Sequence, residues 1–221
     1  MHLFRKITAF WNLVRSHHSQ AKAIVEFQEQ LLHNFTFLFL IFLAGCIASI
    51  GLLRENLAVV IGAMIITPLV NPFMGIPLAL LTGRWKLFWN SLGKVLSGTA
   101  LFWGVAFFLG SVLVPIDHQP SMIVAHPIEL PEVLIAVFAG MVAALALASA
   151  KIYNRISGAA ISLALAPPLA ISGIGFALGQ VNVFWNALTL FAINATGLIV
   201  MGFFVFLIFG FQKPDDINPL N

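Results

Sequence analysis

Six long apolar runs, separated by short polar segments, dominate the pattern of this chain. Each run is long enough to cross about 30 Å of hydrocarbon as a helix. The runs occupy residues 34–53, 57–82, 88–114, 133–150, 156–179 and 185–211. The pattern therefore predicts an all-α polytopic membrane protein with six transmembrane helices, whose membrane domain covers residues 34–211.

Composition excludes an ordinary soluble domain. Hydrophobic residues make up 60% of the chain and charged residues only 9%, with a mean hydropathy of +1.00. Such a chain has too little polar surface to cover a folded domain in water. We therefore expect both its structure and its function to lie in a lipid bilayer.

The segments outside the predicted spans are short, which limits the chemistry available to them. They are residues 1–33, an external connection at 115–132 and a tail at 212–221. The sequence contains no His-Glu-x-x-His zinc motif and no Gly-x-Ser-x-Gly nucleophile motif. We therefore expect no enzyme activity, no catalytic residue, no bound metal and no cofactor.

Within residues 1–33, apolar side chains recur at helical spacing beside basic ones, which is typical of an amphipathic helix. The apolar positions are Leu3, Phe4, Ile7, Phe10, Trp11 and Val14. Such a helix can lie on the anionic cytoplasmic surface of the membrane. Docking of the same apolar face onto a partner subunit is an equal alternative.

Basic residues collect on one side of the predicted membrane domain, and Lys and Arg accumulate in the cytoplasmic segments of membrane proteins. On this side lie Arg5, Lys6, Arg15, Lys22, Arg84, Lys86, Lys151, Arg155 and Lys213. The opposite side has one arginine, Arg54, next to Glu55. We therefore predict a multi-pass protein of the inner (plasma) membrane with both termini cytoplasmic. This asymmetry explains the net charge of +3, so nucleic-acid binding is not expected.

Part of the first half of the chain recurs in the second half. Residues 62–92 align with residues 158–188 at an offset of 96, and ten of the 31 aligned positions are identical. The matches include Gly62/Gly158, Leu69/Leu165, Pro72/Pro168, Gly83/Gly179 and Phe88-Trp89-Asn90/Phe184-Trp185-Asn186. The chain is therefore a duplicated unit, with one copy in residues 34–114 and the other in residues 133–211.

Three spans per copy place the two copies in opposite orientations in the membrane. The loop after each broken span supports this independently. Arg84 and Lys86 follow span two, whereas Gln180 and Asn182 stand at the equivalent positions after span five. Loss of the basic residues is what a change from a cytoplasmic to an external loop requires. The sequence therefore predicts a 3+3 inverted repeat.

Prolines interrupt the second and fifth predicted spans near their middles. A proline within a helix has no N–H donor and displaces the carbonyl four residues earlier. In hydrocarbon each unpaired carbonyl costs several kcal/mol, so it must meet protein, water or a ligand. Matched broken helices in a repeated membrane protein indicate a midplane binding site. The candidate site residues are Thr67, Pro68, Asn71, Pro72, Gly75, Ser162, Pro167, Pro168, Ser172, Gly173 and Asn194.

Two functions fit these features. The first is a transporter or channel for a small ion or neutral solute, in which one repeat rocks against the other. The second is a non-transporting structural or assembly subunit, in which the prolines only shape packing against lipid, other subunits or further copies of the chain. A proton relay is not expected, because no carboxylate lies in the middle of a span. Lys94 lies close enough to the cytoplasmic end of span three to extend to the membrane interface.

Two segments carry a family resemblance. Residues 60–75 read VIGAMIITPLVNPFMG, and residues 164–179 read ALAPPLAISGIGFALG. Both resemble the signature segments of the bacterial "uncharacterised hydrophobic domain" family, one of the domain-of-unknown-function families. The resemblance covers about residues 35–211. It implies a six-span protein of the bacterial inner membrane, and it implies no substrate.

Overall fold

The computed structural model describes residues 34–114, 123, 128–148 and 165–211, and within these ranges all regular secondary structure is helical. The helices are α3 (Asn34–Leu53), α4 (Leu57–Ile66), α5 (Val70–Thr82), α6 (Trp85–Leu113), α7 (Leu130–Ala148), α10 (Ala166–Ala177) and α11 (Val181–Ile208). The all-helical prediction is confirmed for this part of the chain. The predicted amphipathic segment at 1–33, Ser162 and the tail at 212–221 lie outside the described residues.

Four helices, α3, α6, α7 and α11, are long and apolar enough to cross a membrane. The pair α4 and α5 passes the same test as one bent span, with an angle of 43° between its halves. The remaining helix, α10, has 12 residues. Large apolar side chains such as Phe35, Leu96, Phe108 and Phe138 are exposed on these helices, which fits contact with lipid rather than water. The chain is therefore a multi-pass membrane protein.

Helix α7 begins earlier than the hydrophobic pattern predicts. The apolar run starts at residue 133, but the helix begins at Leu130. Pro131 fits here because the first turn of a helix needs no N–H donor. The Glu132 carboxylate accepts a 3.0 Å hydrogen bond from the Glu129 N–H, which is the back-reaching half of a capping box. Capping therefore extends the helix beyond the apolar run.

The offset of 96 residues that relates the two sequence copies also relates their helices. The pair α5 and α6 corresponds to the pair α10 and α11, because each pair begins and turns at equivalent positions. The turns contain Gly83, with φ of 66°, and Gly179, with φ of 68°. The residue after each glycine donates its N–H to a carbonyl of the preceding helix, at 3.0 Å in the first copy and 2.9 Å in the second. Glycine adopts this φ without steric cost, which explains its presence in both copies.

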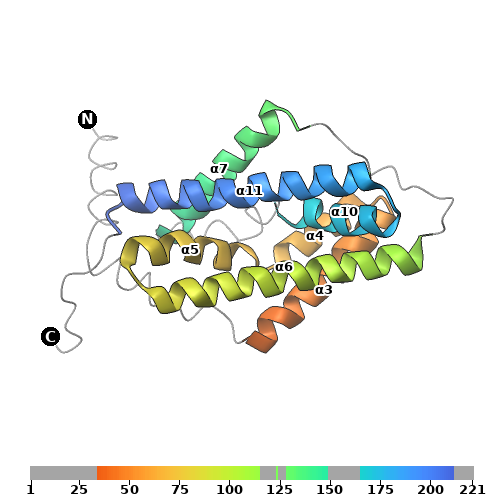
Figure 1. Cartoon of the computed structure of the whole chain (residues 1–221), viewed down its shortest axis with the longest axis horizontal. Helices are drawn as coiled ribbons and strands as arrows, with labels where there is room; N and C mark the ends of the chain where they lie inside the picture. Colours follow the sequence, from red (N-terminus) through yellow and green to blue (C-terminus); the bar gives the residue numbers. More distant parts are fainter. Residues whose placement is uncertain (1–33, 115–122, 124–127, 149–164, 212–221) are drawn as a thin grey trace.

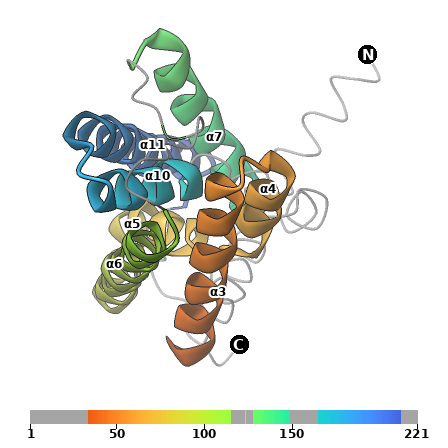
Figure 2. The same ribbon diagram turned by 90° about the vertical axis from the view of Figure 1, so that its right-hand side faces the viewer.

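The short helices pack between the copies. The long helices α6 and α11 run in opposite directions (Figure 1), and each contacts the first helix of its own copy, α3 on α6 and α7 on α11. In addition, α10 packs on α6, and α5 packs on α11. Figure 2 shows the two long helices nearly end-on, with α5 and α10 beside them. The two copies therefore share one apolar core.

Equivalent crossings between the copies require a small residue. A Cβ atom added to Gly173 of α10 would lie 2.8 Å from the Trp103 carbonyl oxygen and 2.9 Å from the Ala106 Cβ of α6. A Cβ atom added to Gly202 of α11 would lie 3.1 Å from the Pro77 ring of α5. Pro77 and Gly173 are equivalent at the offset of 96, as are Ala106 and Gly202. The same crossing of a short helix on a long helix therefore occurs twice. The glycine belongs to the short helix α10 in one crossing and to the long helix α11 in the other. Small residues let membrane helices approach closely in this way.

Candidate binding site at two helix breaks

The first break separates α4 from α5 at Thr67, Pro68 and Leu69. The backbone leaves the helix at Thr67, where ψ is 113°, as expected for a residue that precedes proline. The N–H and the hydroxyl of Thr67 both donate to the Ala63 carbonyl, at 3.1 and 2.8 Å. Thr67 is 5% exposed, so the end of α4 is closed by a buried side chain of its own.

The other two prolines of this span do not break the helix. Pro72 lies in the first turn of α5, where proline is tolerated because no N–H donor is needed. The Phe73 N–H donates to the Leu69 carbonyl at 3.5 Å and closes that turn. Pro77 lies inside α5, which continues past it to Thr82. The break is therefore confined to three residues.

The second predicted break lies next to the start of α10. This helix begins after Leu165, with Pro167 and Pro168 in its first turn. The equivalent residue in the first copy is Leu69, and both leucine carbonyls accept the N–H four residues later, here at 3.4 Å. Ser162 and the other residues before the break lie outside the described part of the chain. The start of the second short helix therefore matches the first.

The prolines lower the cost of starting a helix in an apolar interior. The first four N–H groups of a helix have no partner within it, and burial of an unpaired donor costs free energy. Pro72 removes one of these donors in α5, and Pro167 and Pro168 remove two in α10. Part of the role of these prolines is therefore structural.

Both short helices begin near the middle of the molecule. In Figure 1, α5 and α10 start close to the centre and run toward opposite ends. The N-terminal end of a helix carries a partial positive charge. Two such ends directed at the centre can stabilise a negatively charged or electronegative group between them.

Three polar side chains of the predicted site are buried, namely Thr67, Ser172 and Asn194, which are 5%, 0% and 4% exposed. The Ser172 hydroxyl donates to the Leu169 carbonyl of its own helix at 2.9 Å, much as Thr67 bonds within α4. The hydrogens of both hydroxyl groups are therefore used within their own helices. Asn194 lies on α11, the helix that packs against both α5 and α10.

The remaining predicted residues supply shape more than polar atoms. Pro72, Gly75, Pro168 and Gly173 are buried, whereas Pro68, Asn71 and Pro167 are partly exposed. Gly173 faces α6 so closely that a side chain does not fit there without a shift of the neighbouring helix. The close approach of α10 to α6 at Gly173 gives this glycine a role in contact between helices, and its predicted part in ligand binding stays a prediction.

The structure places Lys94 in a protein environment that the hydrophobic pattern does not indicate. The side chain is 5% exposed, and its Nζ atom lies 5.5 Å from the centroid of the Phe37 ring on α3. Asn90 and Ser97 lie four residues before and three residues after Lys94, which places them on the same helix face. This spacing of polar residues on α6 is the signal in the sequence that could have indicated a polar cluster around Lys94.

Comparison with known proteins identifies the family but not an activity. Residues 64–200 match the model of a family described as "Domain of unknown function (DUF389)", which confirms the resemblance inferred from the two proline segments. The chain is also 27% identical over 172 residues to the "Uncharacterized protein MJ0678" of Methanocaldococcus jannaschii. The alignment covers 77% of this chain and 53% of that relative, so the chain spans about half of the relative's length. No solved structure matches the chain.

Proposed function

The chain belongs to the DUF389 family, and from that premise and its geometry we propose that it is a membrane transporter or channel built as a 3+3 inverted repeat. Six spans would cross the plasma membrane, with both termini cytoplasmic. The site would lie near the midplane, where α5 and α10 begin. The observation that carries the proposal is the matched pair of proline-containing helix starts that face the centre from opposite ends (Figure 1).

Three features support the inverted arrangement. The long helices α6 and α11 run in opposite directions. The turns at Gly83 and Gly179 have matching dihedral angles and hydrogen bonds. The packing of α10 on α6 recurs as the packing of α5 on α11. In transporters of this architecture, one repeat moves against the other and exposes a central site to each side in turn.

The ligand would be a small anion or a neutral solute with an electronegative group. The positive ends of two half-helices point toward the site. None of the described site residues carries a formal charge, and the polar ones are Thr67, Asn71, Ser172 and Asn194. Such a site suits a solute whose water can be replaced by a few hydrogen bonds and helix dipoles.

A non-transporting subunit would use the same breaks only for packing. The local hydrogen bonds of Thr67 and Ser172 also fit that role. The two functions differ in one physical respect, because a transport pathway must bring water and solute to the helix starts. A packing feature would remain dry.

Access of water to the two helix starts therefore distinguishes the functions. In a Cys46→Ala background, single cysteines would be introduced at Asn71 and at the equivalent Pro167, both of which are partly exposed. We expect a membrane-impermeant thiol reagent to modify each cysteine from at least one side of the membrane. The modified fraction would be measured by mass spectrometry of the intact protein.

A lipid-facing position provides the control. Leu96 lies well inside α6 and is 63% exposed, so Leu96→Cys should face hydrocarbon and stay unmodified by the charged reagent. If neither site cysteine reacts in folded protein from either side, the helix starts are dry and the transport proposal is wrong.

A further inference from the structure

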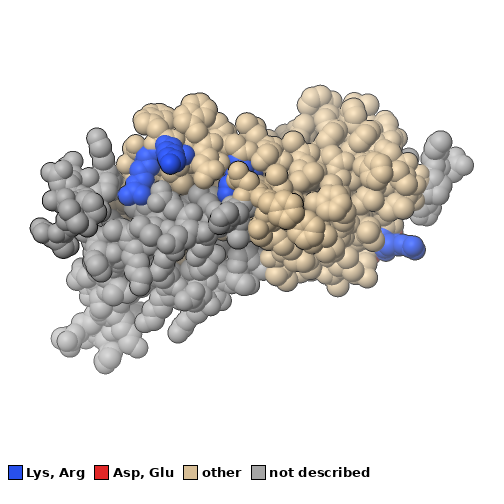
Figure 3. All heavy atoms as spheres, turned by 90° about the horizontal axis from the view of Figure 1, so that it is seen from below, with Lys and Arg blue, Asp and Glu red and all other residues tan. Residues whose placement is uncertain are grey.

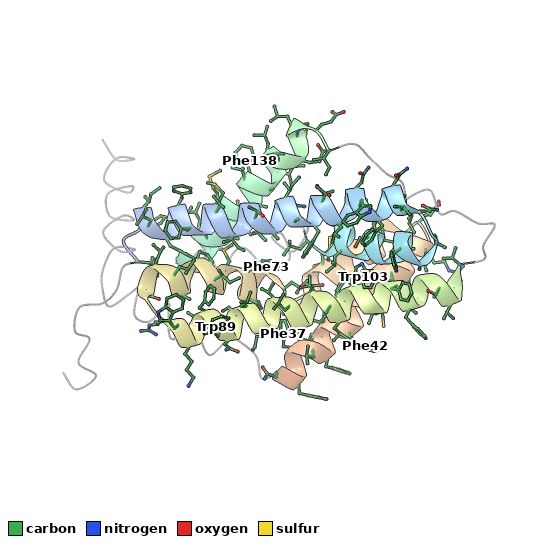
Figure 4. The ribbon with its side chains drawn as sticks, in the orientation of Figure 1. Phe37, Phe42, Phe73, Trp89, Trp103 and Phe138 are labelled. Atoms are coloured by element: carbon green, nitrogen blue, oxygen red, sulfur yellow. The ribbon has the colours of Figure 1, made fainter. Side chains whose placement is uncertain are left out.

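A seam between α3 and α6 contains two cavities, of about 310 and about 350 Å³. On α3 the first cavity is lined by Asn34, Phe37 and Leu38, and the second by Phe42 and Cys46. On α6 the linings lie within residues 89–97 and 100–109. These positions recur every three or four residues on both helices, so the cavities follow one another along one side of the seam. Figure 4 labels Trp89 and Phe37 toward one end of the seam and Phe42 further along it.

The first cavity has a mixed lining of polar and apolar residues that includes a buried cation. Lys94 lines it and is 5% exposed, with its ammonium group against the face of Phe37. Asn34 and Asn90, whose side chains carry amide groups, belong to the same lining. An ammonium group together with amide N–H donors is a set that holds phosphate oxygens by charge-assisted hydrogen bonds.

The second cavity continues the groove with an apolar lining. Phe42, Cys46, Gly104 and Phe108 contribute to it. A Cβ atom added to Gly104 would meet no atom within 4 Å, so this glycine leaves the groove open. From Lys94 to Gly104 the helix advances about 15 Å, which is about half of the hydrocarbon thickness of a bilayer. The groove therefore has the length of one lipid leaflet.

We propose that this groove binds an anionic phospholipid, with the phosphate at Lys94 and an acyl chain in the second cavity. Basic pockets between membrane helices bind anionic headgroups in this way. Trp89, which lines the polar end and is 64% exposed, is a residue type enriched at the membrane interface. In the described part of the face seen in Figure 3, few basic and no acidic side chains interrupt the uncharged surface.

The orientation of the groove agrees with the predicted topology. Its polar end lies nearest to the starts of α3 and α6, which the distribution of basic residues places on the cytoplasmic side. The lipid would therefore come from the cytoplasmic leaflet. This binding site is independent of the transport proposal, because none of its lining residues belongs to the two helix breaks.

Native mass spectrometry of the purified full chain, titrated with phosphatidylglycerol or phosphatidylcholine, tests the headgroup. We expect phosphatidylglycerol to bind about five- to tenfold more tightly than phosphatidylcholine, and Lys94→Met to abolish that difference. Lys94→Arg should retain it, as should Lys86→Met, which removes an exposed charge from the start of the same helix. Equal affinity of the native protein for the two lipids would overturn the proposal, as would an unchanged preference in Lys94→Met.

A second variant tests whether an acyl chain occupies the second cavity. This test can be made even if Lys94→Met does not fold. Gly104 lines the second cavity, and a Cβ atom there meets no neighbour within 4 Å. Gly104→Leu should therefore occupy part of this cavity and weaken phosphatidylglycerol binding severalfold, while the protein stays monodisperse in detergent. Inorganic phosphate should not displace the lipid at millimolar concentration. Undiminished lipid binding by Gly104→Leu would show that no acyl chain occupies the second cavity, and displacement by inorganic phosphate would show that the cavity at Lys94 takes a free anion. Either result would overturn the proposal.

Discussion

Replacement of Gly173 by leucine is expected to leave no folded protein in detergent. A Cβ atom at this position lies 2.8 Å from the Trp103 carbonyl oxygen and 3.1 Å from the Phe107 backbone nitrogen. These atoms belong to helix backbone and cannot turn aside as a side chain would. Gly173→Ala is expected to lower the free energy of unfolding by about 1–3 kcal/mol, even though alanine favours a helix by about 1 kcal/mol over glycine. The midpoint of unfolding in a titration with sodium dodecyl sulfate measures the loss.

Alanine variants of two other glycines serve as comparisons for the loss of stability in Gly173→Ala. A Cβ atom at Gly62 would meet nothing within 4 Å, so Gly62→Ala should leave stability unchanged or raise it. Gly202→Ala should cost less than Gly173→Ala, because one of its neighbours, at 3.3 Å, is the flexible side chain of Met74. Equal stability of the Gly62 and Gly173 variants would mean that α10 does not pack on α6 as described.

Replacement of Gly140 by leucine is expected to separate α7 from α11. A Cβ atom on Gly140 would lie 2.5 Å from the Gly197 carbonyl oxygen and 2.9 Å from the Met201 Cβ. On the other side of the contact, a Cβ atom on Gly197 would lie 2.9 Å from the Ala136 carbonyl oxygen. Neither clash can be relieved by rotation of a side chain. Even Gly140→Ala should cost about 1–3 kcal/mol, and pulse proteolysis should detect cleavage in α7 before global unfolding.

The matched control for this contact is Gly93→Ala. Gly93 lies in the long helix α6, and a Cβ atom there would meet nothing within 4 Å. Its unfolding midpoint should equal that of the native protein or exceed it. A native midpoint for Gly140→Leu would show that the close contact of α7 with α11 is absent.

The sequence repeat predicted more of this fold than the apolar pattern did. It located both glycine turns, because a residue that needs positive φ is kept as glycine in each copy. The apolar pattern located the four long helices α3, α6, α7 and α11, but it gave both ends correctly only for α3. It began spans three and six at residues 88 and 185, whereas α6 begins at Trp85 and α11 at Val181. An apolar run ends where polar residues begin, but a helix can continue through polar residues to the membrane interface. The hydropathy pattern therefore predicts helices that are too short.

The candidate site was predictable where it depends on local chemistry. The sequence predicts interruptions at the prolines, and Pro72 and Pro168 lie in the first turns of α5 and α10, where proline is tolerated. The bond from the Thr67 hydroxyl to a carbonyl four residues earlier is common for Ser and Thr in helices. The packing role of Gly173 and the burial of Lys94 were not predictable, because each depends on how helices of different spans cross.

The sidedness of the two glycine turns tests the inverted repeat most directly. Trp85 and Val181 occupy equivalent positions just after these turns and are 64% and 63% exposed. Their replacement by cysteine, in a Cys46→Ala background, leaves intact the basic residues that direct topology. An inverted repeat predicts that an impermeant thiol reagent labels Val181→Cys in intact cells and labels Trp85→Cys only after permeabilisation. Labelling of both cysteines from the same side would contradict the inverted repeat and, with it, the midplane site.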